Sequence, residues 1–174
     1  MGGLYGHMSH IHEDLDLTFN DIIDILRNLS ELRVDSFEKM DGQNINFTVD
    51  KAGEIRLARN KGNVQAGGLS TAEYATMWKG HPAQESFMRG FEAIQAALKV
   101  LTDKEKQALF SDGNRYQNAE IVYPEGKNII QYDKPMIRLH EAAILFDRKT
   151  GLQAKNDREA FSVAKKLGNF IGSL

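Results

Sequence analysis

A lysine and an aspartate stand two positions apart, directly before a glycine, at Lys39, Asp41 and Gly42. Side chains two apart at the end of a strand project to the same side, and a glycine allows the chain to turn sharply after them. A lysine held in such a pocket loses its proton more readily, through desolvation or neighbouring cations, and it then becomes a nucleophile. From the spacing alone, however, a strand, a turn and a hairpin with exposed polar side chains is the favoured interpretation.

The residues around this pair resemble a known family. The stretch Glu38-Lys39-Met40-Asp41-Gly42 resembles the K-x-D-G lysine motif of the covalent nucleotidyltransferases, the superfamily of ATP-dependent DNA ligases, RNA ligases and mRNA capping enzymes. The continuation Asn44-x-x-Phe47 is similar to the G-x-N-x-x-F extension seen in RNA ligases. The lysine motif is therefore longer than a four-residue match.

Three later segments follow in the order of that family. They are Leu57-Ala58-Arg59-Asn60-Lys61-Gly62, similar to its strand-end arginine segment; Asn118-Ala119-Glu120-Ile121-Val122, similar to its strand with a glutamate; and Leu145-Phe146-Asp147, similar to its motif ending in Phe-Asp. The resemblance covers roughly residues 34 to 148, and the shared order of the segments is its most specific part. The whole chain looks especially like RNA-ligase-like proteins of tailed bacteriophages.

The resemblance implies a chemistry. In the enzymes that the chain resembles, the lysine attacks the α-phosphorus of ATP, which gives a lysyl-AMP adduct and pyrophosphate. The adenylate then passes to a 5′-phosphate end of a nucleic acid before strand joining, and RNA is expected as the substrate more than DNA. ATP and Mg²⁺ are the implied cofactors, and Lys39 is the implied nucleophile.

The resemblance also implies roles for individual residues. Arg59 would hold a phosphate bidentately, which the point charge of a lysine does not do. Glu38 would contact adenine, Glu120 would accept hydrogen bonds from ribose hydroxyls, and Phe146 would stack on the adenine ring. Asn44 would face the phosphate or the metal-bound oxygens. The expected site is Lys39 and Arg59 for catalysis and Glu38, Asp41, Asn44, Glu120 and Phe146 for cofactor binding, with no metal ligand assigned. If the implied fold is right, four side chains converge on one cleft: Lys39, Arg59, Glu120 and Phe146.

The sequence departs from the family pattern after Asp147. Complete nucleotidyltransferase domains carry two further strands there, one with a Glu-Gly-hydrophobic pattern and one with a Lys-x-Lys pair. Only 174 − 147 = 27 residues remain, and they contain neither pattern. Glu125-Gly126 comes too early, and Lys165-Lys166 are adjacent instead of alternating. The chain is thus expected to be either the N-terminal part of a longer enzyme or a shortened relative. The second alternative is a non-catalytic nucleotide- or nucleic-acid-binding or phage assembly module.

A histidine-rich stretch near the N-terminus offers a different chemistry. His7, His10 and His12 could ligate zinc or another transition metal. No second cluster completes a tetrahedral site, because only His81 and His140 remain elsewhere. An N-terminal arm that packs over the domain is therefore the favoured interpretation.

The pattern of elements predicts an α+β fold with antiparallel sheets and flanking helices. The expected order is helix, three strands, three helices, three strands, helix. The first three strands lie between Val34 and Asn60 and include 43–49 and 54–60, and the last three are 119–123, 128–132 and 136–146; helices are expected from 19, from about 70, over 83–101, over 103–110 and from 157. The resemblance implies a ligase-type nucleotidyltransferase (ATP-grasp-like) core, truncated if the chain is a shortened relative. The expected organisation is an N-terminal arm over 1–17 and a nucleotidyltransferase-like domain over 18–174, with a helical insert at about 70–110.

Composition and charge narrow the classes further. The 22 Lys and Arg against 24 Asp and Glu give a net charge of −2, so nucleic-acid binding needs a local basic patch, expected around Arg56, Arg59 and Lys61. The absence of cysteine excludes disulfides, thiolate metal sites and cysteine nucleophiles. No signal peptide and no membrane span is recognisable, so a cytoplasmic location is expected, in the host cell if the protein is from a phage.

Overall fold

The computed structural model describes residues 16–33, 41–124, 130–139, 145–148, 153–154 and 157–171. The chain divides into two compact units, Met1–Met40 and Asp41–Leu174. The division falls inside the lysine motif, whereas the sequence predicts a boundary after residue 17. Each unit is therefore considered by itself.

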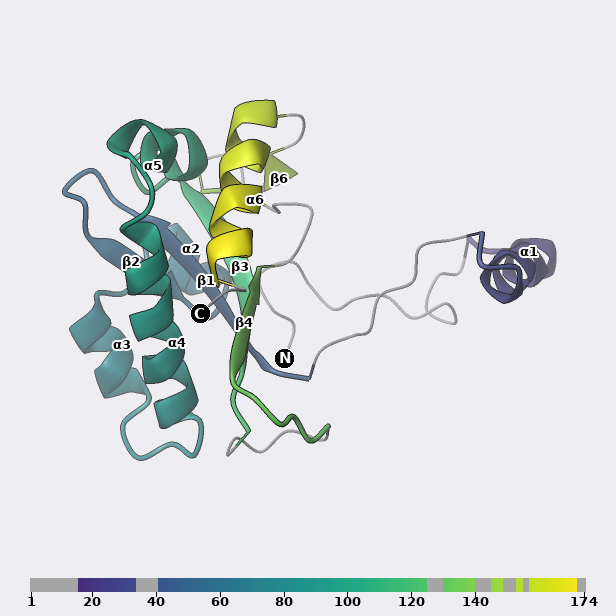
Figure 1. Ribbon diagram of the computed structural model, residues 1–174, viewed down its shortest axis with the longest axis horizontal. Coiled ribbons are helices and arrows are strands. Elements are labelled where there is room, and N and C mark those ends of the chain that lie inside the picture. Colours follow the sequence, from purple (N-terminus) through teal and green to yellow (C-terminus); the bar gives the residue numbers. More distant parts are fainter. Residues whose placement is uncertain are drawn as a thin grey trace. The chain divides into compact units, whose positions relative to one another are not determined.

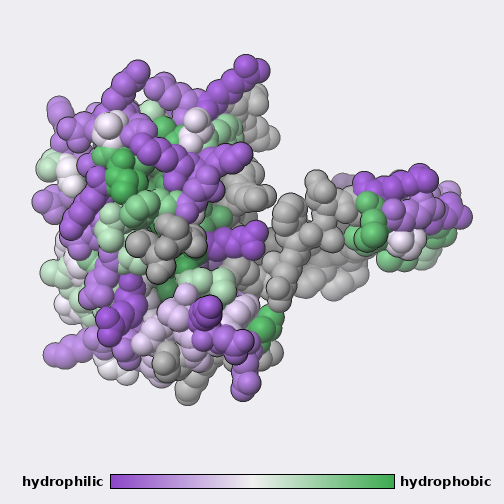
Figure 2. Space-filling view, in the orientation of Figure 1, coloured by the Kyte–Doolittle hydropathy of each residue, from purple (hydrophilic) through white to green (hydrophobic). Residues whose placement is uncertain are grey.

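The described part of the first unit is the helix α1, Phe19–Ser30, which begins where the sequence predicts. Thr18 Oγ1 accepts from the Asp21 N–H at 3.2 Å, and Asp21 Oδ2 accepts from the Thr18 N–H at 2.8 Å, so a capping box starts the helix. Hydrogen bonds that the Thr18 hydroxyl and the Thr18 N–H donate to the carboxylate lower the pKa of Asp21. No residue of α1 is buried within its own unit, and Figure 2 shows hydrophobic and hydrophilic side chains on different sides of this helix.

The second unit is built on an antiparallel sheet. Its strands are β1 (Gln43–Val49), β2 (Ile55–Ala58), β3 (Arg115–Val122), β4 (Met136–Leu139), β5 (Leu145–Asp147) and β6 (Gln153–Ala154). Their order is β2-β1-β3-β5-β6, and β4 also pairs with β3. Strand β3 is central, because β1 pairs along one edge while β4 and β5 pair with different halves of the other. The predicted α+β class with antiparallel strands is confirmed.

Helices cover one face of this sheet (Figure 1). They are α3 (Thr71–Met77), α4 (Gln84–Leu98), α5 (Asp103–Phe110) and α6 (Arg158–Ile171), and α2 (Lys61–Gln65) follows β2 directly. Side chains from α3, α4, α5 and α6 form a single hydrophobic core with β1, β2 and β3. The central residues of this core, all fully buried, are Tyr74, Phe87, Ile94, Leu109, Phe110 and Leu167.

Alternation along β1 separates apolar from polar side chains. Ile45 and Phe47 belong to the helix-covered core. Asn44, Asn46 and Thr48 alternate with them and occupy the opposite face, as the sequence predicts. Asn46 and Thr48 are nevertheless completely buried, so both faces of the central strands are covered.

Several element boundaries differ from the prediction. Strand β3 begins at Arg115, four residues before the predicted 119, because its first half is polar and gives no hydrophobic alternation. The predicted strand over 128–132 is wrong for residues 130–132, which are not in a strand. The predicted strand over 136–146 is two strands, β4 and β5, and residues between them lie outside the described chain. The predicted glycine-rich passage after residue 61 contains α2, which Asn60 caps through Asn63.

Helix α4 crosses β3 at a glycine. A Cβ on Gly90 would overlap Cδ1 of the buried Ile121 and lie 2.7 Å from its Cγ1. In contrast, a Cβ on Gly168 of α6 would lie 3.7 Å from Leu139 Cδ1, an ordinary contact. There is therefore no room for a side chain at Gly90, whereas there is room for one at Gly168.

Gly90→Ala is expected to lower the free energy of unfolding by about 1–3 kcal/mol, through overpacking against Ile121. Gly168→Ala, the matched control, is expected to raise it by about 0.5–1 kcal/mol, because alanine loses less conformational entropy in a helix. Urea denaturation of both variants measures this. In an Ile121→Val background the loss from Gly90→Ala should shrink; an undiminished loss would show that the Ile121 contact is not its cause.

The helices α5 and α6 are joined by an ion pair. Lys166 Nζ lies 2.7 Å from Glu105 Oε1, and Glu105 also completes the capping box with Thr102. The Lys166 ammonium and the hydrogen bonds from Thr102 lower the pKa of Glu105 to about 2. The folded chain therefore favours the ionised carboxyl group.

Acid is expected to remove the stabilisation that Glu105 contributes. Because its pKa is lower when folded, this contribution is complete above the unfolded-state pKa of ~4.3 and is lost as the pH falls toward about 2. The melting temperatures of the parent chain and Glu105→Gln should therefore differ near neutral pH and converge as the pH approaches this value. Lys165→Met is the control, because Lys165 is the exposed lysine next to Lys166 in α6. A difference that stays constant across this range would contradict the expectation.

Candidate functional site

Three hydrogen bonds fix the Asp41–Gly42 step, the first described part of the lysine motif. The Asp41 N–H donates to Tyr132 Oη at 2.8 Å, and Asp41 Oδ2 accepts from the Ile130 N–H at 3.1 Å. The Gly42 N–H donates to Glu120 Oε1 at 2.9 Å. These bonds join residues 78 to 91 positions apart in the sequence. The step is thus anchored to β3 and to the segment that follows it.

Gly42 is required by close packing on β3. A Cβ at this position would lie 2.6 Å from the carbonyl oxygen of Ile121 and 2.7 Å from Glu120 Cγ, closer than real Cβ atoms approach. The sequence suggests a sharp turn as the reason for this glycine, but Gly42 is not among the glycines with positive φ. The missing side chain instead lets the Gly42 N–H reach the Glu120 carboxylate.

Side-chain amides from β1 and β3 form a hydrogen-bonded row on the polar face of the sheet. Asn118 Nδ2 donates to Asn44 Oδ1 at 3.1 Å and to Asn46 Oδ1 at 2.8 Å. Asn44 Nδ2 donates back to Asn118 Oδ1 at 3.1 Å, and Asn46 Nδ2 donates to the Ala58 carbonyl oxygen at 3.4 Å. Asn46 and Asn118 are buried, whereas Asn44 is partly exposed. Because buried amides need partners, this row explains how the sheet accommodates Asn46 and Asn118.

The strand register brings together two predicted site residues, and a third, Arg59, contacts the backbone of one of them. Asn44 pairs directly with Glu120. Arg59 follows β2, and its guanidinium carbon lies 5.8 Å from the centre of the Phe87 ring in α4, on the helix-covered side. Its Nη1 donates to the Asn44 carbonyl oxygen at 2.6 Å. Arg59 therefore holds the β1 backbone, and its convergence with the Glu120 side chain on one cleft stays a prediction.

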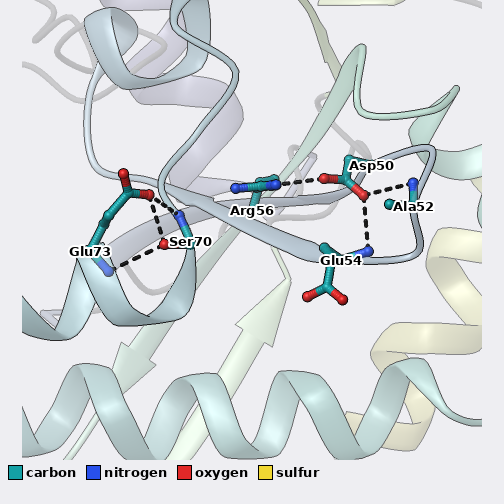
Figure 3. Close-up of polar contacts among 6 residues, drawn as sticks. All are labelled: Asp50, Ala52, Glu54, Arg56, Ser70 and Glu73. Atoms are coloured by element: carbon teal, nitrogen blue, oxygen red, sulfur yellow. Dashed lines mark hydrogen bonds and ion pairs between the residues drawn. The ribbon is translucent and has the colours of Figure 1, made fainter.

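Acidic groups surround Arg56, one of the residues of the predicted basic patch (Figure 3). Arg56 Nε lies 2.8 Å from Asp50 Oδ2, and this hydrogen bond is the main reason that the pKa of Arg56 is raised. Burial raises the pKa of Asp50, but hydrogen bonds from Arg56 and from the backbone N–H groups of Glu54 and Ala52 outweigh it, so the pKa is lowered. Arg56 is thus paired with an acidic group through its Nε atom. The basic patch around Arg56, Arg59 and Lys61 stays a prediction, and Lys61 is exposed at the start of α2.

Other predicted site residues are described in part or not at all. Lys39 and Glu38 lie outside the described residues, as do His7, His10 and His12. Phe146 lies in β5, where its backbone pairs with Tyr116 of β3. Within the described ranges, no group of three or more His, Asp or Glu side chains could hold a metal ion. Zinc binding by the histidines stays a prediction.

Two residues of this region were not singled out by the sequence. Asn118 joins Asn44 to Asn46, and Tyr132 holds the N–H of Asp41. An asparagine inside a strand is unfavourable unless its amide has hydrogen-bond partners. The sequence could therefore have indicated that Asn118 bonds to the amides of β1. The role of Tyr132 could not be predicted in this way, because its bond to the Asp41 N–H joins residues 91 positions apart.

The chain matches no family model, no curated protein and no solved structure. Among the helices of the described ranges, none has the length and apolar character needed to cross a membrane. The site is therefore interpreted from its own geometry and from the resemblance of its motifs.

Gly42→Ala is expected to lower the free energy of unfolding by about 1–3 kcal/mol, because the new methyl group would collide with the backbone of β3. Chemical denaturation followed by circular dichroism measures this change. Side-chain amide signals of Asn44 and Asn118 in a ¹⁵N NMR spectrum should shift as well, since both lie beside the displaced strands. A variant with parent-like stability and unshifted amide signals would contradict the close packing of residue 42.

Proposed function

We propose that this chain is an ATP-dependent polynucleotide ligase-like nucleotidyltransferase that forms a lysyl-AMP intermediate at Lys39 and acts on nucleic acid 5′-phosphate ends, RNA more than DNA. One observation carries the proposal. The Asp41–Gly42 step of the lysine motif is bonded to Glu120 of the Asn118–Val122 segment, at 2.9 Å and across 78 positions. Two segments that resemble the same family separately therefore meet at one place in the fold.

The proposed reaction uses a neutral Lys39 amine. Its Nζ attacks the α-phosphorus of ATP, a P–N bond forms, the bond from the α-phosphorus to the bridging oxygen breaks, and pyrophosphate leaves. The amine proton passes to solvent. Nearby cations would lower the pKa of the lysine, so that part of it is unprotonated. Hydrogen-bond donors of the site would stabilise the negative charge on the phosphates.

The remaining roles in the proposal follow from the resemblance and from the contacts described. Asn44 would donate to a phosphate oxygen, Glu38 and Phe146 would contact adenine, and Glu120 would face the ribose while it holds Gly42. Arg59 would bind a phosphate through the N–H groups that Asn44 does not use. Mg²⁺ would be held mainly by the phosphates of ATP, since Mg²⁺ takes few protein ligands in such sites.

Covalent labelling tests the proposal. The purified chain is incubated with Mg²⁺ and ATP labelled at the α-phosphate, then resolved on a denaturing gel. Label is expected to stay on the protein, and Lys39→Ala and Lys39→Arg are both expected to abolish it, because neither side chain offers a neutral amine. ATP labelled at the γ-phosphate should leave no label, since that phosphate departs with pyrophosphate.

Lys51→Ala is the control, because Lys51 is an exposed lysine in the turn between β1 and β2. It should label like the parent chain. Absence of label in the parent chain, or label that survives Lys39→Ala, would overturn the enzymatic proposal. An unlabelled chain that still binds Mg²⁺–ATP at equilibrium would instead favour the non-catalytic binding module.

A further inference from the structure

We infer that Asn118 is a positioning residue, which fixes the Asn44 side chain so that it presents a hydrogen-bond donor to the nucleotide. This inference rests on the proposed function and deepens it, because it assigns a role to a residue that the motifs leave without one. The argument follows the amide row from its buried end to its partly exposed end.

The buried end of the row is anchored by a backbone carbonyl. Asn46 Nδ2 donates to the Ala58 carbonyl oxygen at 3.4 Å. Because a carbonyl oxygen only accepts, the amide of Asn46 must turn its NH₂ group toward β2. Its Oδ1 atom then faces β3, and Asn46 is completely buried, so water does not offer it an alternative partner.

The orientation of the Asn46 amide determines the orientation of the Asn118 amide. Asn46 Oδ1 requires a donor, and Asn118 Nδ2 supplies it at 2.8 Å. The same Nδ2 donates its second hydrogen to Asn44 Oδ1 at 3.1 Å. Both N–H groups of Asn118 are therefore used, and its Oδ1 is left to accept from Asn44 Nδ2 at 3.1 Å.

The orientation of Asn44 follows from these bonds. One hydrogen of its Nδ2 points to Asn118, and the second has no acceptor among the described residues. A rotated Asn44 amide would place Oδ1 against Asn118 Oδ1 and NH₂ against NH₂, which replaces two attractions with two repulsions. The row thus keeps an N–H donor, and not an acceptor, at its partly exposed end.

This distinction matters for a phosphate ligand. An N–H group bonds favourably to an anionic oxygen, whereas the lone pairs of an amide oxygen would repel it. The backbone of Asn44 is held as well, because Arg59 Nη1 donates to its carbonyl oxygen at 2.6 Å. Asn44 is therefore fixed at both its main chain and its side chain before the nucleotide binds.

Side-chain NMR of the ¹⁵N-labelled chain, titrated with Mg²⁺–ATP, tests the inference. In the parent chain, one Nδ2 proton of Asn44 is expected to shift on titration, while the proton bonded to Asn118 is expected to shift little. In Asn118→Ala the response of Asn44 should disappear and the Kd for Mg²⁺–ATP should rise about tenfold, as for the loss of one hydrogen bond to a charged group. Asn114→Ala, which removes an amide that bonds to Ser111 at the start of β3, should bind as the parent does.

A double variant separates positioning from general support of the fold. If Asn118 acts through Asn44, then Asn44→Ala with Asn118→Ala should bind no more weakly than Asn44→Ala alone. Additive losses, a parent-like Asn118→Ala, or an Asn44 amide in the parent chain that ignores Mg²⁺–ATP would each overturn the inference. The last measurement needs no variant, so it decides the matter even where a variant does not fold.

The two proposals fail independently. A chain without covalent label whose Asn44 amide responds to Mg²⁺–ATP would overturn the enzymatic function and leave the role of Asn118 in place. A labelled chain whose Asn44 amide does not respond would do the reverse.

Discussion

Strand β3 carries side chains of opposite character on its two faces, and both faces are covered. Ala119 and Ile121 pack into the helix-covered core, while Asn118, on the other face, is only 3% exposed. An amide at that depth is strongly unfavourable unless its hydrogen bonds are made. The partners come from β1, at Asn44 and Asn46. This requirement sets the register of β1 on β3 and, through Asn44, the geometry of the candidate site.

Local signals in the sequence were sufficient for much of the fold. The capping residues Thr18, Ser70 and Thr102 begin helices as predicted, and the alternation of β1 predicts its two faces. These features depend on neighbours within a few residues. The polar first half of β3 was missed for the same reason: fully buried Gln117 sits in a strand because of pairing with β1, not because of its own preference.

The candidate site shows the same division between local and distant causes. The resemblance of the motifs indicates which residue types belong together, and Asn44 does pair with Glu120. It did not reveal that Glu120 holds the N–H of Gly42, or that Arg59 turns toward Phe87. Which side of a sheet a residue faces after its strand has ended depends on what packs there. That information lies in α4, whose position the motifs do not encode.

The pairing of β1 with β3 also has a consequence for how the chain reaches its fold. Asn46 and Asn118 are 72 positions apart, and β2 and four helices lie between them. During synthesis β1 and β2 emerge long before β3, so β1 has an unpaired edge and a polar face without its partners. Contacts of such separation slow folding, and open strand edges invite pairing between chains. Any shorter form of this protein that ends before β3 would therefore be prone to aggregate.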